Sequence, residues 1–65
     1  MNRARVIGII LNARTMEEVK NARQVRAEYL SDHPDDYEIV DYGGFLLRLQ
    51  EALEVTESEQ MARSA

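Results

Sequence analysis

The stretch 37–55 carries the strongest pattern in the chain, because five large apolar residues recur in it at spacings of three and four. These residues are Ile39, Tyr42, Leu46, Leu49 and Leu53. At about 100° per residue, this spacing places all five on one narrow stripe of an α-helix. The stretch therefore predicts a packing helix, and we expect its stripe to be core or subunit interface.

Chain length limits how much of this stripe the other residues of the same chain can bury. A chain of 65 residues buries little of its surface, and a core of this size rarely supplies more than about 3–5 kcal/mol of stability. There is no cysteine, and His33 is the single histidine, so disulfides and thiolate zinc sites are excluded. We therefore expect no metal and no cofactor. A partner chain is the remaining source of stability, which predicts an obligate oligomer, most simply a homodimer.

Charge is divided unevenly along the chain. Residues 1–30 carry a net charge of +3 and residues 31–65 one of −7, within a total of −4. A basic half and an acidic half favour pairing with each other, within one chain or between chains. The overall acidity argues against non-specific nucleic-acid binding but not against a local basic arm, and the apolar run at 6–11 is too short to span a membrane. We expect a soluble, cytoplasmic protein.

The segment 1–11 allows two interpretations. Val6, Ile7, Ile9 and Ile10 are β-branched, which favours a short buried strand, but a run of this length is also compatible with a helix. A strand needs partners for its backbone groups, and no other stretch has a clear strand pattern. A strand here would therefore pair with its copy in a second subunit.

A first helix is predicted at 15–31. Thr15 and Glu18 fit a capping box, in which the Thr15 hydroxyl accepts from the backbone N–H of Glu18 and the Glu18 carboxylate accepts from that of Thr15. Arg23 and Arg26 project from the apolar side of this helix. Either their stems cover apolar surface, or a carboxylate holds at least one of them, with Glu38 or an acid of a second subunit expected for Arg26.

A second helix is predicted at 34–55, because Pro34 suits a first helical turn and acidic residues follow it. The apolar stripe keeps its phase across Gly43 and Gly44, so we expect the helix to continue through them. Gly43 borders the stripe and is predicted to mark the closest approach to another backbone, whereas Gly44 points away. The polar stretch 56–65 is expected to form a flexible tail.

Together these elements predict a mainly α fold. Residues 1–55 form one small domain, an antiparallel two-helix hairpin with a short N-terminal apolar segment that is a possible strand. Two copies are expected to assemble as a dimeric helical bundle. The predicted core and interface residues are Val19, Ala22, Arg23, Arg26, Tyr29, Ile39, Tyr42, Gly43, Leu46, Leu49 and Leu53.

No constellation of residues indicates catalysis. Nucleophilic catalysis needs a nucleophile beside an oriented base, and glycine-rich phosphate loops are absent from the sequence. The pair Asp35 and Asp36 is explained by its place at a helix start. We expect no enzyme and no catalytic residue. The sequence predicts a small helical protein–protein interaction or regulatory module, acting as an adaptor, an inhibitor or a subunit of a larger complex.

One alternative is a dimeric DNA-binding regulator that resembles the ribbon-helix-helix class. The order of a possible strand, a helix, a turn and a second helix fits it, and Arg3 and Arg5 would contact DNA from a two-stranded ribbon. On such a strand, Ile7 and Ile9 would lie on the same outward face as Arg3 and Arg5, and their apolar side chains would recognise bases poorly. The acidic second helix would also sit unfavourably near phosphates. The interaction module therefore remains the leading hypothesis.

Overall fold

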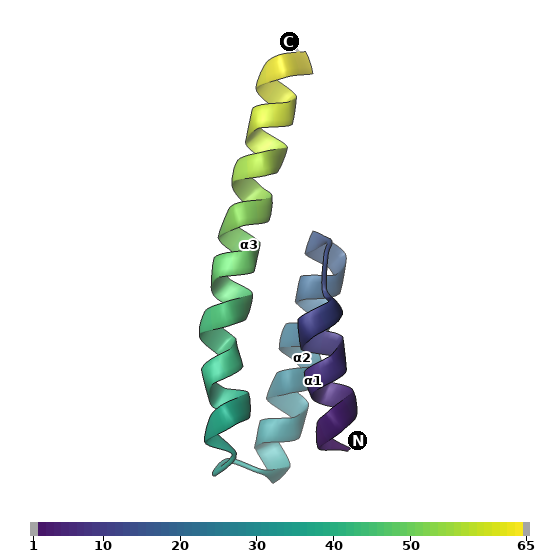
Figure 1. Ribbon diagram of the computed structural model, residues 1–65, viewed down its shortest axis with the longest axis vertical. Coiled ribbons are helices and arrows are strands. Elements are labelled where there is room, and N and C mark those ends of the chain that lie inside the picture. The colour runs from purple at the N-terminus through teal and green to yellow at the C-terminus, as the bar shows by residue number, and fades with distance from the viewer. Residues whose placement is uncertain (1, 65) are drawn as a thin grey trace.

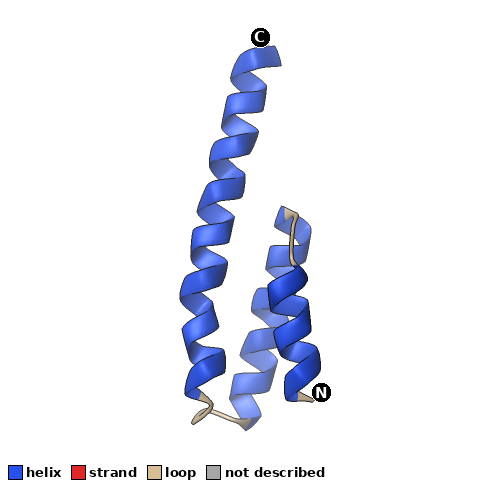
Figure 2. Ribbon diagram, in the orientation of Figure 1, coloured by secondary structure: helices blue, strands red, loops and turns tan. Residues whose placement is uncertain are grey.

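The computed structural model describes residues 2–64, apart from the side chains of residue 58 and residues 60–64. Within this part of the chain, helices α1 (Arg3–Asn12), α2 (Met16–Asp32) and α3 (Tyr37–Ser64) follow one another through two short connections (Figures 1 and 2). Residues 2–64 contain no strand, so the prediction of a mainly α fold is confirmed.

Helix α2 lies at the centre of the arrangement, because it packs against both α1 and α3 and runs antiparallel to each (Figure 1). Helix α3 is the longest, with 28 residues. At 1.5 Å per residue it spans about 42 Å, which accounts for the elongated dimensions of 46 × 17 × 15 Å. The C-terminal part of α3 extends past the α1–α2 connection (Figure 1).

The predicted two-helix hairpin is not the observed architecture, because the N-terminal segment is a helix, α1, and the strand interpretation is wrong. The Asn2 side chain caps this helix and accepts a hydrogen bond from the backbone N–H of Arg5 at 2.8 Å. Val6 and Ile10 lie one turn apart and are both fully buried. Burial of this helical face outweighs the weaker helix propensity of β-branched residues.

Helix α2 is close to its predicted range. As expected, the Thr15 hydroxyl accepts from the backbone N–H of Glu18, at 3.1 Å. The Glu18 carboxylate reaches one residue further back than predicted, because it accepts from the backbone N–H of Arg14 at 3.1 Å rather than from that of Thr15. The cap therefore also holds the connection between α1 and α2 in place.

Helix α3 begins at Tyr37 instead of Pro34, which lies in the preceding turn. Asp36 marks the start, since its carboxylate accepts from the backbone N–H of Ile39 at 3.4 Å. The helix is continuous through both glycines and extends beyond the predicted end at residue 55. The flexibility expected for 56–65 stays a prediction, and residue 65 lies outside the described residues.

The core lies where the three helices meet. Its buried residues are Val6, Ile10, Ala13, Val19, Ala22, Val25, Tyr29, Ile39 and Leu46. Of the predicted stripe, Ile39 and Leu46 are fully enclosed, while Tyr42, Leu49 and Leu53 are partly buried at the margin of the core. The structure describes one chain, and assembly into a dimer stays a prediction. None of the described helices is both long enough and apolar enough to cross a membrane.

Replacement of Leu46 by Ala should lower the free energy of unfolding by about 2–5 kcal/mol, because Leu46 is 1% exposed and its loss leaves a cavity. Leu49→Ala is the matched control. It should cost less than Leu46→Ala, because the partly buried Leu49 side chain already borders solvent. Urea melts followed by circular dichroism measure both variants, and equal losses would contradict this assignment of the core.

Candidate protein-interaction surface

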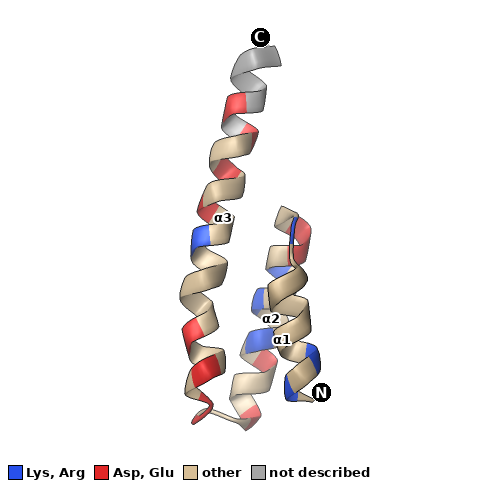
Figure 3. Ribbon diagram, in the orientation of Figure 1, with Lys and Arg blue, Asp and Glu red and all other residues tan. Residues whose placement is uncertain are grey.

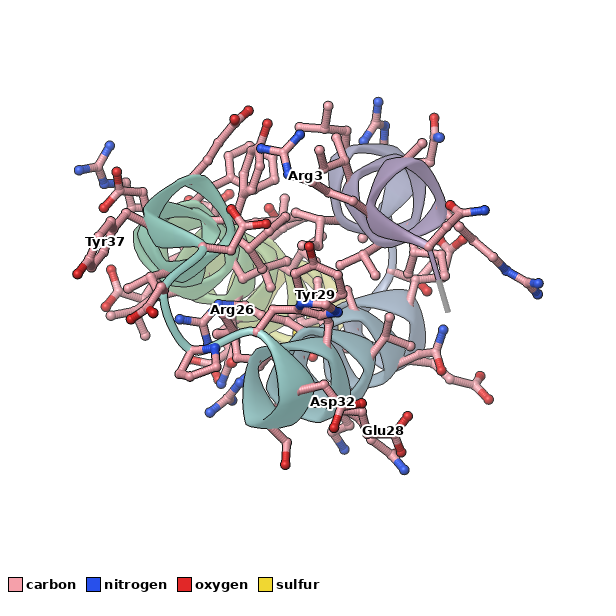
Figure 4. All side chains as sticks on the ribbon, turned by 90° about the horizontal axis from the view of Figure 1, so that it is seen from below. Arg3, Arg26, Glu28, Tyr29, Asp32 and Tyr37 are labelled. Carbon is pink, nitrogen blue, oxygen red and sulfur yellow. The ribbon has the colours of Figure 1, made fainter. Side chains whose placement is uncertain are left out.

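The ends of the three helices are joined by a polar network centred on the Asp36 carboxylate. Its Oδ2 atom accepts from the Tyr29 hydroxyl at 2.7 Å and from Arg3 Nε at 3.0 Å. The second arm of the Arg3 guanidinium donates to Glu38 Oε2. Figure 4 shows Tyr29 between the helices, with Arg3 beside it at the start of α1. Arg3 therefore links α1 to α3, and its guanidinium binds carboxylates of the same chain.

The same contacts shift the pKa values of the groups involved. The hydrogen bond from Tyr29 lowers the pKa of Asp36, and the Arg3 guanidinium lowers it further. In turn, the hydrogen bond to Asp36 raises the pKa of Tyr29, which keeps the phenol protonated. Bonds to Glu38 and Asp36 raise the pKa of Arg3. The network thus favours the ionised form of the Asp36 carboxyl group.

Asp36→Asn tests this network through the dependence of stability on pH. The pKa of Asp36 is lower in the folded chain than in the unfolded chain, so its contribution is present above the unfolded pKa and is lost as pH falls through the folded value. The wild type should be the more stable protein near neutral pH. Its advantage over Asp36→Asn should shrink between about pH 5 and about pH 2. Urea melts across this range measure it, and a pH-independent difference would contradict the network.

Arg26 crosses from α2 to the main chain of α3. Its Nε donates to the carbonyl of Ile39 at 3.0 Å, and its Nη2 donates to that of Val40 at 2.9 Å. The predicted contact between Arg26 and Glu38 is wrong within this chain, because Glu38 binds Arg3 instead. A Cβ atom at Gly43 would lie 2.7 Å from Arg26 Nη2. Gly43 therefore provides the space through which the guanidinium reaches these carbonyls.

The two glycines of α3 differ as the sequence predicted, although the neighbour of Gly43 is not the expected backbone. A Cβ atom at Gly43 would instead meet the flexible end of the Arg26 side chain, which can be displaced. A Cβ atom at Gly44 would meet nothing within 4 Å. Nothing in the described part of the chain therefore requires a glycine at position 44.

A double-mutant cycle tests the role of Gly43. Gly44→Ala should stabilise the chain by up to about 1 kcal/mol, because alanine is the better helix former. Gly43→Ala should stabilise the chain less than Gly44→Ala, because the added methyl group displaces the Arg26 guanidinium from its hydrogen bonds. In an Arg26→Ala background the two substitutions should become equivalent. Thermal melts of the six proteins measure this, and a Gly43→Ala effect that is independent of Arg26 would contradict it.

Beside Arg26 the surface combines positive charge with apolar area. Arg23 donates to Gln50 Oε1 on α3 at 2.9 Å. A small cleft of about 190 Å³ lies between the helices and is lined by Arg23, Arg26, Gly43, Leu46 and Leu47.

The outward side of α3 carries a second apolar pattern, which the sequence analysis missed. Tyr37, Val40, Gly44 and Leu47 recur at spacings of three, four and three, and we call them the outer face. Tyr37 is 72% exposed, Val40 39% and Leu47 55%. Figure 4 shows Tyr37 pointing away from the other helices. The signal was available in the sequence, because the outer face has the same heptad spacing as the buried stripe.

Among the other exposed apolar residues, Val55 is 58% exposed and lies five helical turns after Tyr37 on the same side of α3, whereas Phe45 and Leu11 lie elsewhere. Phe45 is 39% exposed, but its ring packs edge-on against Tyr42 with centroids 6.4 Å apart, on the opposite flank of α3. Leu11 is 43% exposed at the end of α1. The outer face is therefore the exposed apolar surface of α3 that has the regular spacing of a packing helix.

The predicted interface residues fall into three groups. Val19, Ala22, Tyr29, Ile39 and Leu46 are buried in the core, and Tyr42, Leu49 and Leu53 border it. Arg23, Arg26 and Gly43 lie at the α2–α3 contact. Of the residues of the DNA-binding alternative, Arg3 is bound by two carboxylates, and Arg5 lies exposed on α1.

The described residues contain no group of three or more histidine, aspartate or glutamate side chains placed to hold a metal ion. Comparison with known proteins identifies no relative: the chain matches no family model, no curated protein and no solved structure. The geometry of the outer face is therefore the observation from which function is argued.

Proposed function

We propose that this protein is a small helical interaction module without catalytic activity, and that its outer face on α3 binds a helix of another chain. The observation that carries the proposal is the regular exposure of Tyr37, Val40 and Leu47 on one side of a helix whose other side is already buried. A helix with apolar residues on two sides exposes one of them to water unless a partner covers it.

The spacing of the outer face supports a helical partner. Residues at alternating intervals of three and four form a seam that fits against a similar seam on a second helix, as in coiled coils and helical bundles. The glycine in the seam leaves room for a side chain of that partner. A module of this kind acts by occupying a surface of its partner, as an adaptor, an inhibitor or a subunit.

The DNA-binding alternative loses its main support. It requires a paired N-terminal strand, and residues 3–12 are helical. Arg3 is held by Asp36 and Glu38 and so is not free to contact a phosphate or a base. No other feature of the described residues favours it, and it is not proposed.

Affinity capture from cells of the source organism tests the proposed function, with Leu47→Gln as the disrupting variant and Leu11→Gln as the matched control. Both substitutions replace an exposed leucine on a helix. We expect at least one protein, a second copy of the chain included, to be recovered about tenfold less with Leu47→Gln and unchanged with Leu11→Gln. Quantitative mass spectrometry measures recovery. Equal capture by all three proteins would contradict the proposal.

A further inference from the structure

The outer face is complementary to itself when two α3 helices run in opposite directions. We propose that its partner is a second copy of this chain, with the two α3 helices antiparallel and Leu47 of each copy packed over Gly44 of the other. This inference rests on the proposed function and names the occupant of the same surface. The arrangement has twofold symmetry, in which one patch serves both subunits.

Gly44 supplies the first argument. A glycine inside a helix lowers its stability, and Gly43 is explained by the passage of Arg26 whereas Gly44 has open space beside it. In the outer face, Gly44 and Leu47 are adjacent positions of one seam. When two seams run antiparallel about a point between these residues, each Leu47 lies opposite the Gly44 of the other copy. The glycine then provides a hole for the leucine side chain.

Charge supplies the second argument. Asp41 and Arg48 lie seven residues apart, on the same edge of the outer face, and both are exposed. Neither side chain forms an ion pair or hydrogen bond with another described residue. In the antiparallel register, Asp41 of each copy lies opposite Arg48 of the other, which gives two symmetric ion pairs. A parallel pair would place Arg48 opposite Gly43 instead, so the charges select the antiparallel direction.

A third complementary contact between the two copies lies at the other edge of the outer face. Arg26 lies at this edge, since its guanidinium binds the carbonyl of Val40. In the same register, Glu51 of the second copy lies opposite Val40 and so near Nη1 of this arginine, the guanidinium nitrogen that donates to neither the Ile39 nor the Val40 carbonyl. Figure 3 shows the wider pattern, with basic residues on α2 beside the acidic helix α3. The acidic part of one α3 thus meets the basic edge of the other copy, which favours self-association over pairing with an unrelated acidic helix.

Two charge-reversal variants of the full chain test the register. Asp41→Arg leaves two positive charges on the edge of the outer face, and Arg48→Asp leaves two negative charges. Each variant alone places like charges opposite each other and should stay monomeric. Mixed in equal amounts, the two variants should form a heterodimer, because every facing pair is then opposite in sign. Sedimentation equilibrium measures the mass, and circular dichroism confirms that both variants keep the helical content of the wild type.

A contact between one helix from each copy is small, so we expect the wild type to form a reversible dimer with a Kd of about 0.01–1 mM in place of the obligate oligomer that the chain length predicted. Its mass should rise from 7.5 kDa towards twice that value over this concentration range. Leu47→Gln should remain monomeric throughout and serves as a second variant that changes no charge. A wild type that stays at 7.5 kDa, single variants that dimerise like the wild type, or a mixture that fails to associate would overturn the inference.

These outcomes are separable from failure of the proposed function. If the purified chain is monomeric but another protein is captured in a manner that depends on Leu47, self-association is wrong and the interaction module stands. If nothing captured depends on Leu47 and the chain is monomeric, both are wrong.

Discussion

Burial of one side of α3 against α1 and α2 is the constraint on which the rest of the structure depends. Ile39 and Leu46 are fully enclosed there, and the remaining residues of the buried stripe surround them. A helix has a second side, and two short helices can cover only one. Val40 and Leu47 therefore remain exposed although they are apolar and regularly spaced. The fold of the chain and its candidate interaction surface are two sides of the same helix.

Helix α1 makes this arrangement possible within 65 residues. Its residues Val6 and Ile10 complete a core that α2 and α3 could not close as a hairpin. The Asp36 carboxylate then joins the helices through polar contacts, because it accepts from Tyr29 on α2 and Arg3 on α1 while marking the start of α3. The N-terminal segment thus contributes to the interior of its own chain. Its Arg3 side chain contributes to the fold through ion pairs with Asp36 and Glu38.

Much of the helical architecture could be predicted from local patterns, as with the capping box at Thr15 and the stripe through Leu46. The helix at the N-terminus could not be assigned, because Ile7 and its β-branched neighbours fit a strand equally well and only packing decided between the two. The pairing of Arg3 with Asp36 joins residues far apart in sequence, and no local pattern encodes it. The outer face was detectable but overlooked, since the stronger stripe dominates the same stretch of sequence.

The most direct measurement is the backbone amide NMR spectrum recorded at increasing concentrations of the wild-type protein. If α3 folds the chain with one side and pairs with the other, the amide signals of Val40, Gly44 and Leu47 should shift most as concentration rises. Signals of buried residues in α1 and α2 should change little. Unchanged spectra would contradict the pairing of two α3 helices. Shifts centred on Leu11 and Phe45 would contradict the assignment of the interaction surface to the outer face of α3.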